Sequence, residues 1–312
     1  MSRAVVTGGA GFLGSHLVER LLHDGWEVVA IDSLVTGSWS NLPEAATLER
    51  VELDVSDPFE VEGPVDIVFH LASIASPVDY VRLPLQTLWA GSLGTHTTLE
   101  LAERKGAAYF LASTSEVYGD PDVTPQPETY WGNVNPVGPR SMYDESKRYA
   151  EAYATAFAAE RGLRVQIVRI FNTYGPRMRA DDGRAIPTFI RQALTGEALT
   201  VHGDGTQTRS LCYVDDLIDG VLAIAGSNVS GPVNLGNPQE LTISEIAERV
   251  RDMVGSNSEI VFTDRPPDDP ERRRPDISVA RSIGWEPRTE LDEGLRATIA
   301  WARDVWSRSV SS

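Results

Sequence analysis

The chain has 312 residues, of which 41% are hydrophobic, and its formal net charge is −17. This charge provides no diffuse positive field for nucleic acid or an anionic membrane, so we expect neither as a partner. No apolar run approaches the roughly 18 residues of a membrane-spanning helix. A single cysteine, Cys212, excludes an internal disulfide and suits packing better than reactivity. With a strand predicted almost at the first residue, we expect a cytoplasmic enzyme without a signal peptide.

The first ordered stretch is predicted to be a strand, a tight turn and a helix. Gly9, Gly11 and Gly14 match G-x-G-x-x-G, and Gly8, Gly11 and Gly14 match a wider spacing. Glycines let the turn bend sharply and let a pyrophosphate approach the backbone, while the helix N-terminus offers N–H groups to the phosphates. A glycine turn can also serve chain reversal alone, so the motif needs support from the residues that follow.

That support comes from Asp32, which ends a second strand predicted at residues 26–31. An acid is expected roughly 20 residues after the glycines, where it accepts hydrogen bonds from an adenosine ribose. A carboxylate there would repel a 2′-phosphate, so the pattern favours NAD over NADP. The alternative is a solvated residue at a strand end.

Alternating strand and helix patterns predict an α/β protein, with a Rossmann-type doubly wound parallel sheet and a smaller C-terminal α/β substrate domain. Further strands are expected at residues 48–53, 65–72, 108–112 and 165–171. Helices are expected at residues 15–23, 85–105, 143–161 and 185–194, with a loop at 73–84 over the ligand edge of the sheet. Residues 213–225 are expected to return to the nucleotide domain, and residues 241–254, 259–262 and 291–307 to build the smaller domain. We assign residues 1–176 and about 211–238 to the NAD-binding domain, and about 177–210 and 239–312 to the nucleotide-sugar-binding domain.

His70 lies at the end of the strand predicted at residues 65–72. We interpret it as a packed strand-end histidine in preference to a catalytic group or a metal ligand. Because no other histidine, cysteine or acid lies at ligand spacing from it, no metal site is predicted.

Tyr143 and Lys147 are four residues apart, which places both on one face of a helix. To act as a base near neutrality, a tyrosine must lose about three units from its ordinary pKa of about 10. A lysine cation about 4 Å away could supply about 4 kcal/mol at an effective dielectric constant near 20. The pair follows the polar strand end at residues 113–115, which favours catalysis over an exposed pair on a surface helix.

At these residues the chain resembles the extended short-chain dehydrogenases/reductases of the nucleotide-sugar branch, over nearly its full length. Within that branch it is most similar to UDP-glucuronate decarboxylases, also called UDP-xylose synthases. The segments that carry the resemblance are residues 70–73, 76–77, 112–120, 130–132, 135–136, 138–140, 143–145, 169–173, 175–178, 207–209, 234–238 and 274–277. Glu116 decides the narrower resemblance, because related 4-epimerases typically have a small hydroxyl residue there and 4,6-dehydratases have Asp-Glu within the triplet.

The resemblance implies that Tyr143 takes the proton of the sugar 4-hydroxyl while a hydride passes to NAD, giving a 4-keto uronate that loses carbon dioxide. The returning hydride then gives UDP-xylose, so NAD is recycled and retained. Lys147 would hold the nicotinamide ribose, Thr114 or Ser115 the developing oxygen charge, and Glu116 with Arg209 would control decarboxylation and protonation. The implied catalytic set is Thr114, Ser115, Glu116, Tyr143, Lys147 and Arg209.

The remaining implied contacts concern the two ligands and a partner copy. Cofactor contacts are expected from Gly8, Gly11, Phe12, Leu13, Gly14, Asp32, Gly37, Asp54, Val55, Leu71, Ala72, Ser73, Tyr143 and Lys147. Contacts with the UDP-sugar are expected from Pro77, Tyr80, Glu116, Asn172, Arg177, Val201, Arg209 and Arg274. For the arginines the alternative is surface ion pairing. A homodimer through the helices that follow Gly94 and Tyr143 is also implied.

Two residues depart from the family pattern: Gly91 stands where asparagine is usual, and so does Ser33. Both are expected near the cofactor and could alter its affinity. The alternative functions are a UDP-glucuronate 4-epimerase or another NAD-dependent nucleotide-sugar epimerase or dehydratase, and a non-catalytic NAD-sensing protein on the same fold.

Overall fold

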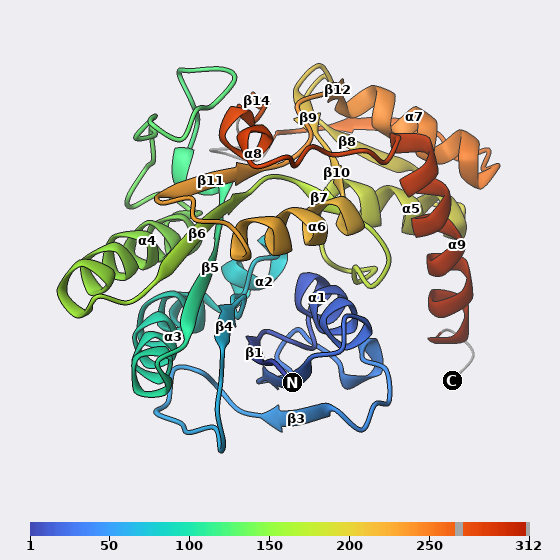
Figure 1. The fold of residues 1–312 in the computed structure, drawn as a ribbon. Coiled ribbons are helices and arrows are strands. Elements are labelled where there is room, and N and C mark those ends of the chain that lie inside the picture. Colours follow the sequence, from blue (N-terminus) through green and yellow to red (C-terminus); the bar gives the residue numbers. More distant parts are fainter. Residues whose placement is uncertain (266–270, 310–312) are drawn as a thin grey trace.

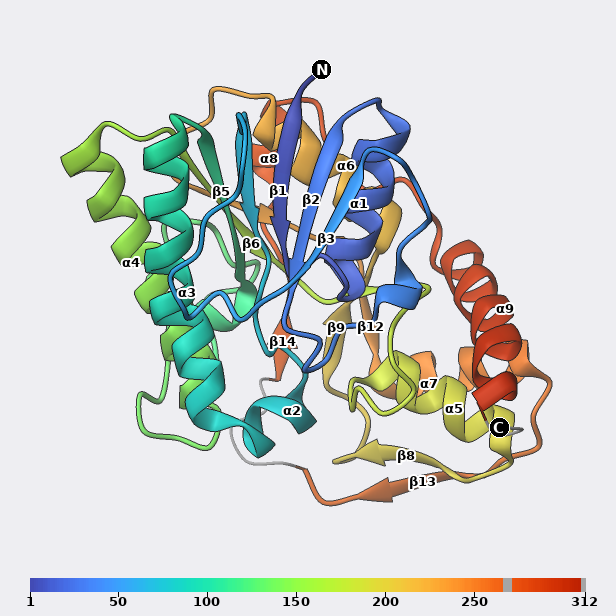
Figure 2. The same ribbon diagram turned by 90° about the horizontal axis from the view of Figure 1, so that it is seen from below.

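The computed structural model describes residues 1–265 and 271–309, and a parallel sheet forms its centre. The seven strands lie in the order β11-β6-β5-β4-β1-β2-β3, as Figures 1 and 2 show. They are β1 (Arg3–Thr7), β2 (Glu27–Asp32), β3 (Leu48–Glu52), β4 (Ile67–His70), β5 (Ala108–Thr114), β6 (Val165–Ile170) and β11 (Pro232–Leu235). The predicted doubly wound sheet is therefore confirmed. Because the strand order reverses between β1 and β4, a ligand crevice is expected at their carboxyl ends.

Helices cover both faces of the sheet (Figure 2). On one face lie α1 (Phe12–His23), α6 (Val214–Ala225) and α8 (Ser278–Ser282), and on the other lie α3 (Pro84–Lys105) and α4 (Ser141–Arg161). The alternation of side chains along β1 shows why: Ala4 and Val6 pack into the first core and Val5 into the second. A parallel strand buried on both faces needs an apolar middle, which Ala4, Val5 and Val6 provide in β1.

A smaller lobe lies beyond the carboxyl ends of the strands (Figure 2). It contains α5 (Ala185–Thr195), α7 (Ile243–Val254), α9 (Leu291–Ser309), the strand pair β8 (Leu199–His202) with β13 (Ile260–Thr263), and the sheet β12 (Glu240–Thr242)-β9 (Thr208–Ser210)-β14 (Arg272–Arg273). The short pair β7 (Thr173–Tyr174) and β10 (Cys212–Tyr213) links the lobe to the sheet. Ile277 and Ala280 of the α8 region pack into the core beside α6, so the proposed domain division stays a prediction.

The loop predicted at residues 73–84 contains a helix, α2 (Pro77–Arg82). Ser76 caps it by accepting a hydrogen bond from the Asp79 N–H at 3.4 Å, and Pro77 takes the first helical position. The loop prediction missed this helix because its six residues are too few for a helical periodicity to show. The strands β11 and β14 also escaped prediction, since they have only four and two residues.

Gly91 lies where α3 and α4 pack closely. A Cβ atom at this position would lie 2.5 Å from Cβ of Ser146 on α4, well inside van der Waals contact. The missing side chain of Gly91 therefore allows the two helices to approach. None of the helices in the described part of the chain is both long and apolar enough to cross a membrane.

We predict that Gly91→Ala destabilises the protein by about 1–3 kcal/mol through overlap with Ser146. Ser146→Gly alone should cost about 1 kcal/mol, because glycine is a poor helix former. The double variant should be more stable than the sum of the two changes predicts, since the overlap is gone. Urea unfolding of the four proteins measures this coupling, and strictly additive free energies would contradict the close contact.

Candidate active site

A cavity of about 670 Å³ runs along the carboxyl ends of the sheet strands and reaches the smaller lobe. Most of the predicted site residues line it: Gly8, Gly11, Phe12, Leu13, Gly14, Asp32, Asp54, Val55, Leu71, Ala72, Ser73, Pro77, Tyr80, Thr114, Ser115, Glu116, Tyr143, Lys147, Asn172, Arg177 and Arg209. Ser33 also lines it, whereas Gly37, Val201, Arg274 and Gly91 do not.

The glycine loop forms one end of this cavity and fits a pyrophosphate. Gly8 has a φ of 70°, and a Cβ at Gly14 would lie 2.0 Å from the carbonyl oxygen of Gly8. Neither position tolerates a side chain. Gly11 precedes α1 as its N-cap residue and has no side chain that could cap the first-turn N–H groups. These are the features that bind a phosphate at a helix N-terminus.

Asp32 lies at the end of β2 beside the loop, with 8% of its surface exposed. Its carboxylate accepts hydrogen bonds from the N–H groups of Ala10 at 3.0 Å and Leu34 at 2.8 Å. Burial raises its pKa, and these backbone donors oppose the rise. Gly37 packs against this carboxylate, where a Cβ atom would lie 2.7 Å from Oδ1. Its missing side chain leaves room for Asp32, and Gly37 itself does not line the cavity. The loop and Asp32 together fit a dinucleotide.

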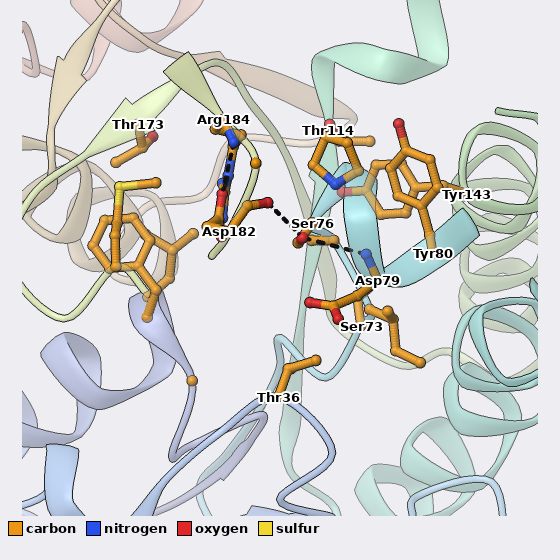
Figure 3. A pocket seen from close by; sticks show the side chains of 18 of the residues that line it. Thr36, Ser73, Ser76, Asp79, Tyr80, Thr114, Tyr143, Thr173, Asp182 and Arg184 are labelled. Atoms are coloured by element: carbon orange, nitrogen blue, oxygen red, sulfur yellow. Dashed lines mark hydrogen bonds and ion pairs between the residues drawn. The ribbon is translucent and has the colours of Figure 1, made fainter. Parts of the chain in front are cut away.

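Tyr143 projects from the first turn of α4 into the middle of the cavity. Its ring stacks on Tyr80 of α2, with centroids 5.4 Å apart and an interplanar angle of 9° (Figure 3). Burial and the charge of Glu116 raise the pKa of the Tyr143 hydroxyl, while a hydrogen bond with Thr114 and the cation of Arg184 lower it. Burial dominates, so the phenol is neutral in these surroundings.

Lys147 lies one turn further along α4, as the spacing predicts. Its ammonium donates a hydrogen bond to the carbonyl oxygen of Ala112 at 2.9 Å. Burial lowers the pKa of Lys147 to about 8, opposed by Glu151. Burial outweighs the cations near the phenol in the chain alone, so the lowering of the Tyr143 pKa by Lys147 together with bound NAD stays a prediction.

Glu116 is the centre of a buried ion cluster next to Tyr143. It projects from the 3₁₀ turn η2 (Ser115–Tyr118), directly after β5. Arg140 donates to its carboxylate at 2.6 Å, and Arg273 donates from both terminal nitrogens. Burial opposes ionisation, but Arg273, Arg140 and Arg209 hold the pKa of Glu116 below its ordinary value. We call Glu116, Arg140 and Arg273 the Glu116 cluster.

Arg273 lines the cavity, whereas Arg274, the predicted contact with the UDP-sugar, does not. Arg273 is opposite Arg209 in the parallel pair of β14 with β9, so both guanidiniums reach the cavity. Alternation sends the next residue to the other face, and Nη1 of Arg274 lies 3.8 Å from Glu240. Val201 was likewise misplaced: it is fully buried in β8, and its neighbours line the cavity.

Three arginines that line the cavity were not predicted as site residues: Arg140, Arg184 and Arg273. Arg140 belongs to the segment 138–140 that carries the family resemblance, whereas Arg273 could be found only from the pairing of β14 with β9. Arg184 had no signal, since only the tertiary fold brings it near Tyr143. It pairs with Asp182 through two nitrogens at 2.5 and 2.7 Å, as Figure 3 shows.

His70 is buried and lies 2.9 Å from the hydroxyl of Thr7 through Nδ1. Burial lowers its pKa to about 3, so the imidazole is neutral and packed, as predicted. Among residues 1–265 and 271–309, no three histidine, cysteine or acidic side chains are arranged to hold a metal ion.

Comparison with known proteins agrees with this geometry. The model of the NAD dependent epimerase/dehydratase family matches residues 4–236. The chain belongs to this family. Its cofactor is NAD, and the glycine loop with Asp32 fits that dinucleotide. The solved dTDP-glucose 4,6-dehydratase of Streptomyces venezuelae, with NAD and TYD bound, superimposes with a TM-score of 0.89 at 29% identity over 98% of both chains.

Curated relatives are more similar in sequence. UDP-glucuronic acid decarboxylase 1 of Xenopus tropicalis is 51% identical over 96% of this chain and 72% of its own length. UDP-glucuronic acid decarboxylase 3 of Arabidopsis thaliana is 50% identical over 94% of this chain and 86% of its own length.

We predict that Asp32→Ala weakens NAD binding by about 10- to 100-fold, because a charged hydrogen-bond acceptor for the ribose is lost. NADP should gain relative to NAD, since the carboxylate no longer repels a 2′-phosphate. Calorimetric titration of both cofactors measures the two effects. Glu27→Gln, an exposed acid at the other end of β2, is the control. An unchanged ratio of the two affinities would overturn the role of Asp32.

Proposed function

We propose that the chain is a UDP-glucuronate decarboxylase, which forms UDP-xylose through a 4-keto intermediate and uses one NAD repeatedly. The observation that carries this proposal is the Glu116 cluster, an ionised carboxylate held by two guanidiniums beside Tyr143 and Thr114. About 50% identity to proteins named UDP-glucuronic acid decarboxylase, over 94–96% of the chain, supports it.

Tyr143 and Thr114 are positioned for the oxidation step. Tyr143 would take the proton of the sugar 4-hydroxyl as a phenolate, which the positive charge of bound NAD would favour against the burial that raises its pKa. Thr114 would donate a hydrogen bond to the oxygen that becomes the ketone. Lys147, on the same helix face, would hold the nicotinamide ribose. NAD, when bound, supplies the hydride acceptor, its positive charge and the later hydride donor.

The Glu116 cluster would act on the second step. In the 4-keto uronate the bond from C5 to the carboxylate can break, because the ketone accepts its electrons. An ionised Glu116 beside that carboxylate favours its departure as neutral carbon dioxide, which removes one of two neighbouring negative charges. Asn172, Arg177 and Arg209 would bind the uridine diphosphate from the lobe side of the cavity.

We also propose a homodimer that buries the outer faces of α3 and α4. Leu88, Trp89 and Leu93 on α3 and Tyr149 on α4 are large apolar side chains exposed to solvent in the single chain. Such a surface is typical of a protein interface.

A cytoplasmic location stays a prediction from the single cysteine.

The purified protein incubated with UDP-glucuronate should give UDP-xylose and carbon dioxide in equal amounts, without net NADH. Nucleotide-sugar chromatography and a carbon dioxide assay measure this. UDP-galacturonate with all carbon retained would refute the proposal and identify a 4-epimerase.

We predict that Glu116→Gln slows carbon dioxide release by about 100-fold and leaves the first reduction of bound NAD within about threefold. Absorbance at the NADH band in a single turnover separates the two steps. Tyr143→Phe is the matched comparison, because it should stop both. Equal slowing of both steps in Glu116→Gln would show that Glu116 has no selective part in decarboxylation.

A further inference from the structure

A second, smaller cavity of about 270 Å³ lies behind the Glu116 cluster. Glu116, Arg140 and Arg273 line both cavities, so the cluster is the wall between them. The exposed Asp120 also lines the smaller cavity. Water can therefore approach the cluster from the side opposite the sugar site.

Asp144 lines the smaller cavity and not the larger one, although it follows Tyr143 in the chain. Only 7% of its surface is exposed, and its Oδ1 has no hydrogen-bond partner among the described residues. A buried carboxylate oxygen without a partner is costly unless the group is protonated or solvated.

The charged groups around Asp144 favour its protonated form, while Glu116 beside it stays ionised. Glu116 faces it from η2, Arg273 from β14, and Arg140 and Glu145 from its own chain neighbourhood. The phenols of Tyr80 and Tyr143 also lie within its field. Burial and Glu116 raise the pKa of Asp144 to about 7, against the opposing arginines, while Glu116 stays ionised. Near neutrality Asp144 thus carries the proton that Glu116 lacks.

The proposed reaction needs such a proton. When carbon dioxide leaves, the electron pair of the broken bond passes through C5 and C4 to the ketone oxygen as an enolate, and C5 must then gain a proton. The proton that Tyr143 took returns to the 4-oxygen when the ketone is reduced, so it is not available for C5. The arginines of the cluster do not release protons at working pH. One proton must enter from solution in every turnover.

We propose that Asp144 is the proton relay of this site, connecting water in the smaller cavity to the sugar through Glu116. The inference rests on the proposed decarboxylase function. Asp144 passes its proton to the Glu116 carboxylate, which passes it to C5, and Asp144 then takes a proton from water in the smaller cavity. The balance is one proton consumed and one carbon dioxide released, with no redox change beyond the internal hydride transfer.

Asp144→Asn tests the relay, because asparagine keeps the size of the side chain and cannot exchange a proton. UDP-xylose formation should slow by about 100-fold, while reduction of bound NAD in the first turnover stays within about threefold of the parent. In the parent, activity should fall as the pH rises through about 7, where Asp144 loses its proton. The variant should lack this fall and show a larger solvent deuterium isotope effect on UDP-xylose formation.

Two further variants keep the test sharp. Glu145→Gln removes a carboxylate from the same turn, where Glu145 lies 3.6 Å from Arg148 and outside both cavities. It should keep the parent's rate at about pH 6 and move the fall in activity only to a slightly lower pH, because the charge of Glu145 adds a small part to the raised pKa of Asp144. Asp144→Ala should regain rate with added formate, more at lower pH, because a small acid fits the cavity.

The outcomes separate two failures. A parent protein that makes no UDP-xylose would refute the proposed function. A parent that makes it, with an Asp144→Asn variant that keeps the rate, pH profile and isotope effect, would overturn the relay alone. Equal slowing of NAD reduction and product formation would also overturn the relay, because it indicates a structural role.

Discussion

The burial of the Glu116 carboxylate between two guanidiniums is the constraint on which the site depends. Each partner comes from a different part of the fold: Glu116 follows β5 of the central sheet, Arg140 precedes α4, and Arg273 lies on β14 of the lobe. A buried charge without its partners costs several kcal/mol, so the ion cluster is stable only when sheet, helix and lobe have come together. Gln126 reinforces this join, since its backbone N–H donates to the Arg274 carbonyl and its side chain accepts from the Arg274 N–H.

A second set of contacts closes the cavity from the other side. The Ser76 hydroxyl donates to the Asp182 carbonyl oxygen at 2.7 Å (Figure 3). Arg179 lies 2.9 Å from the buried Asp79. These contacts tie α2 to the segment after β7. They also keep Tyr80 stacked on Tyr143 and bring Arg184 close to the phenol. Tyr143 is therefore enclosed by contacts between the sheet and the lobe on both sides of the cavity. The burial that results raises the pKa of its hydroxyl.

Local patterns predicted those parts of the site that lie within one element or one turn. The glycines and Asp32 belong to a single strand-turn-helix-strand unit, and Tyr143 and Lys147 to one helix face, so spacing alone could place them. Arg273 could be separated from Arg274 only by knowing that β14 pairs with β9. Asp144 belongs to the segment 143–145 that carries the family resemblance, but its protonation state could not be predicted, because that state depends on Glu116 and on a cavity that exists only in the folded chain.

The chain has a net charge of −17, yet several arginines line its cavity. A diphosphate sugar approaches an acidic protein without long-range attraction, so its binding must come from short-range contacts within the cavity. Arg177, Arg184, Arg209 and the two arginines of the Glu116 cluster line that cavity, where water is scarce and each charge acts more strongly than at the surface. Arginine suits this position because it stays charged when buried, whereas Lys147, the lysine of the same site, has its pKa lowered to about 8 by burial. The choice of arginine over lysine around Glu116 thus keeps its carboxylate ionised and leaves Asp144 as the acid that can take up and release a proton near neutrality.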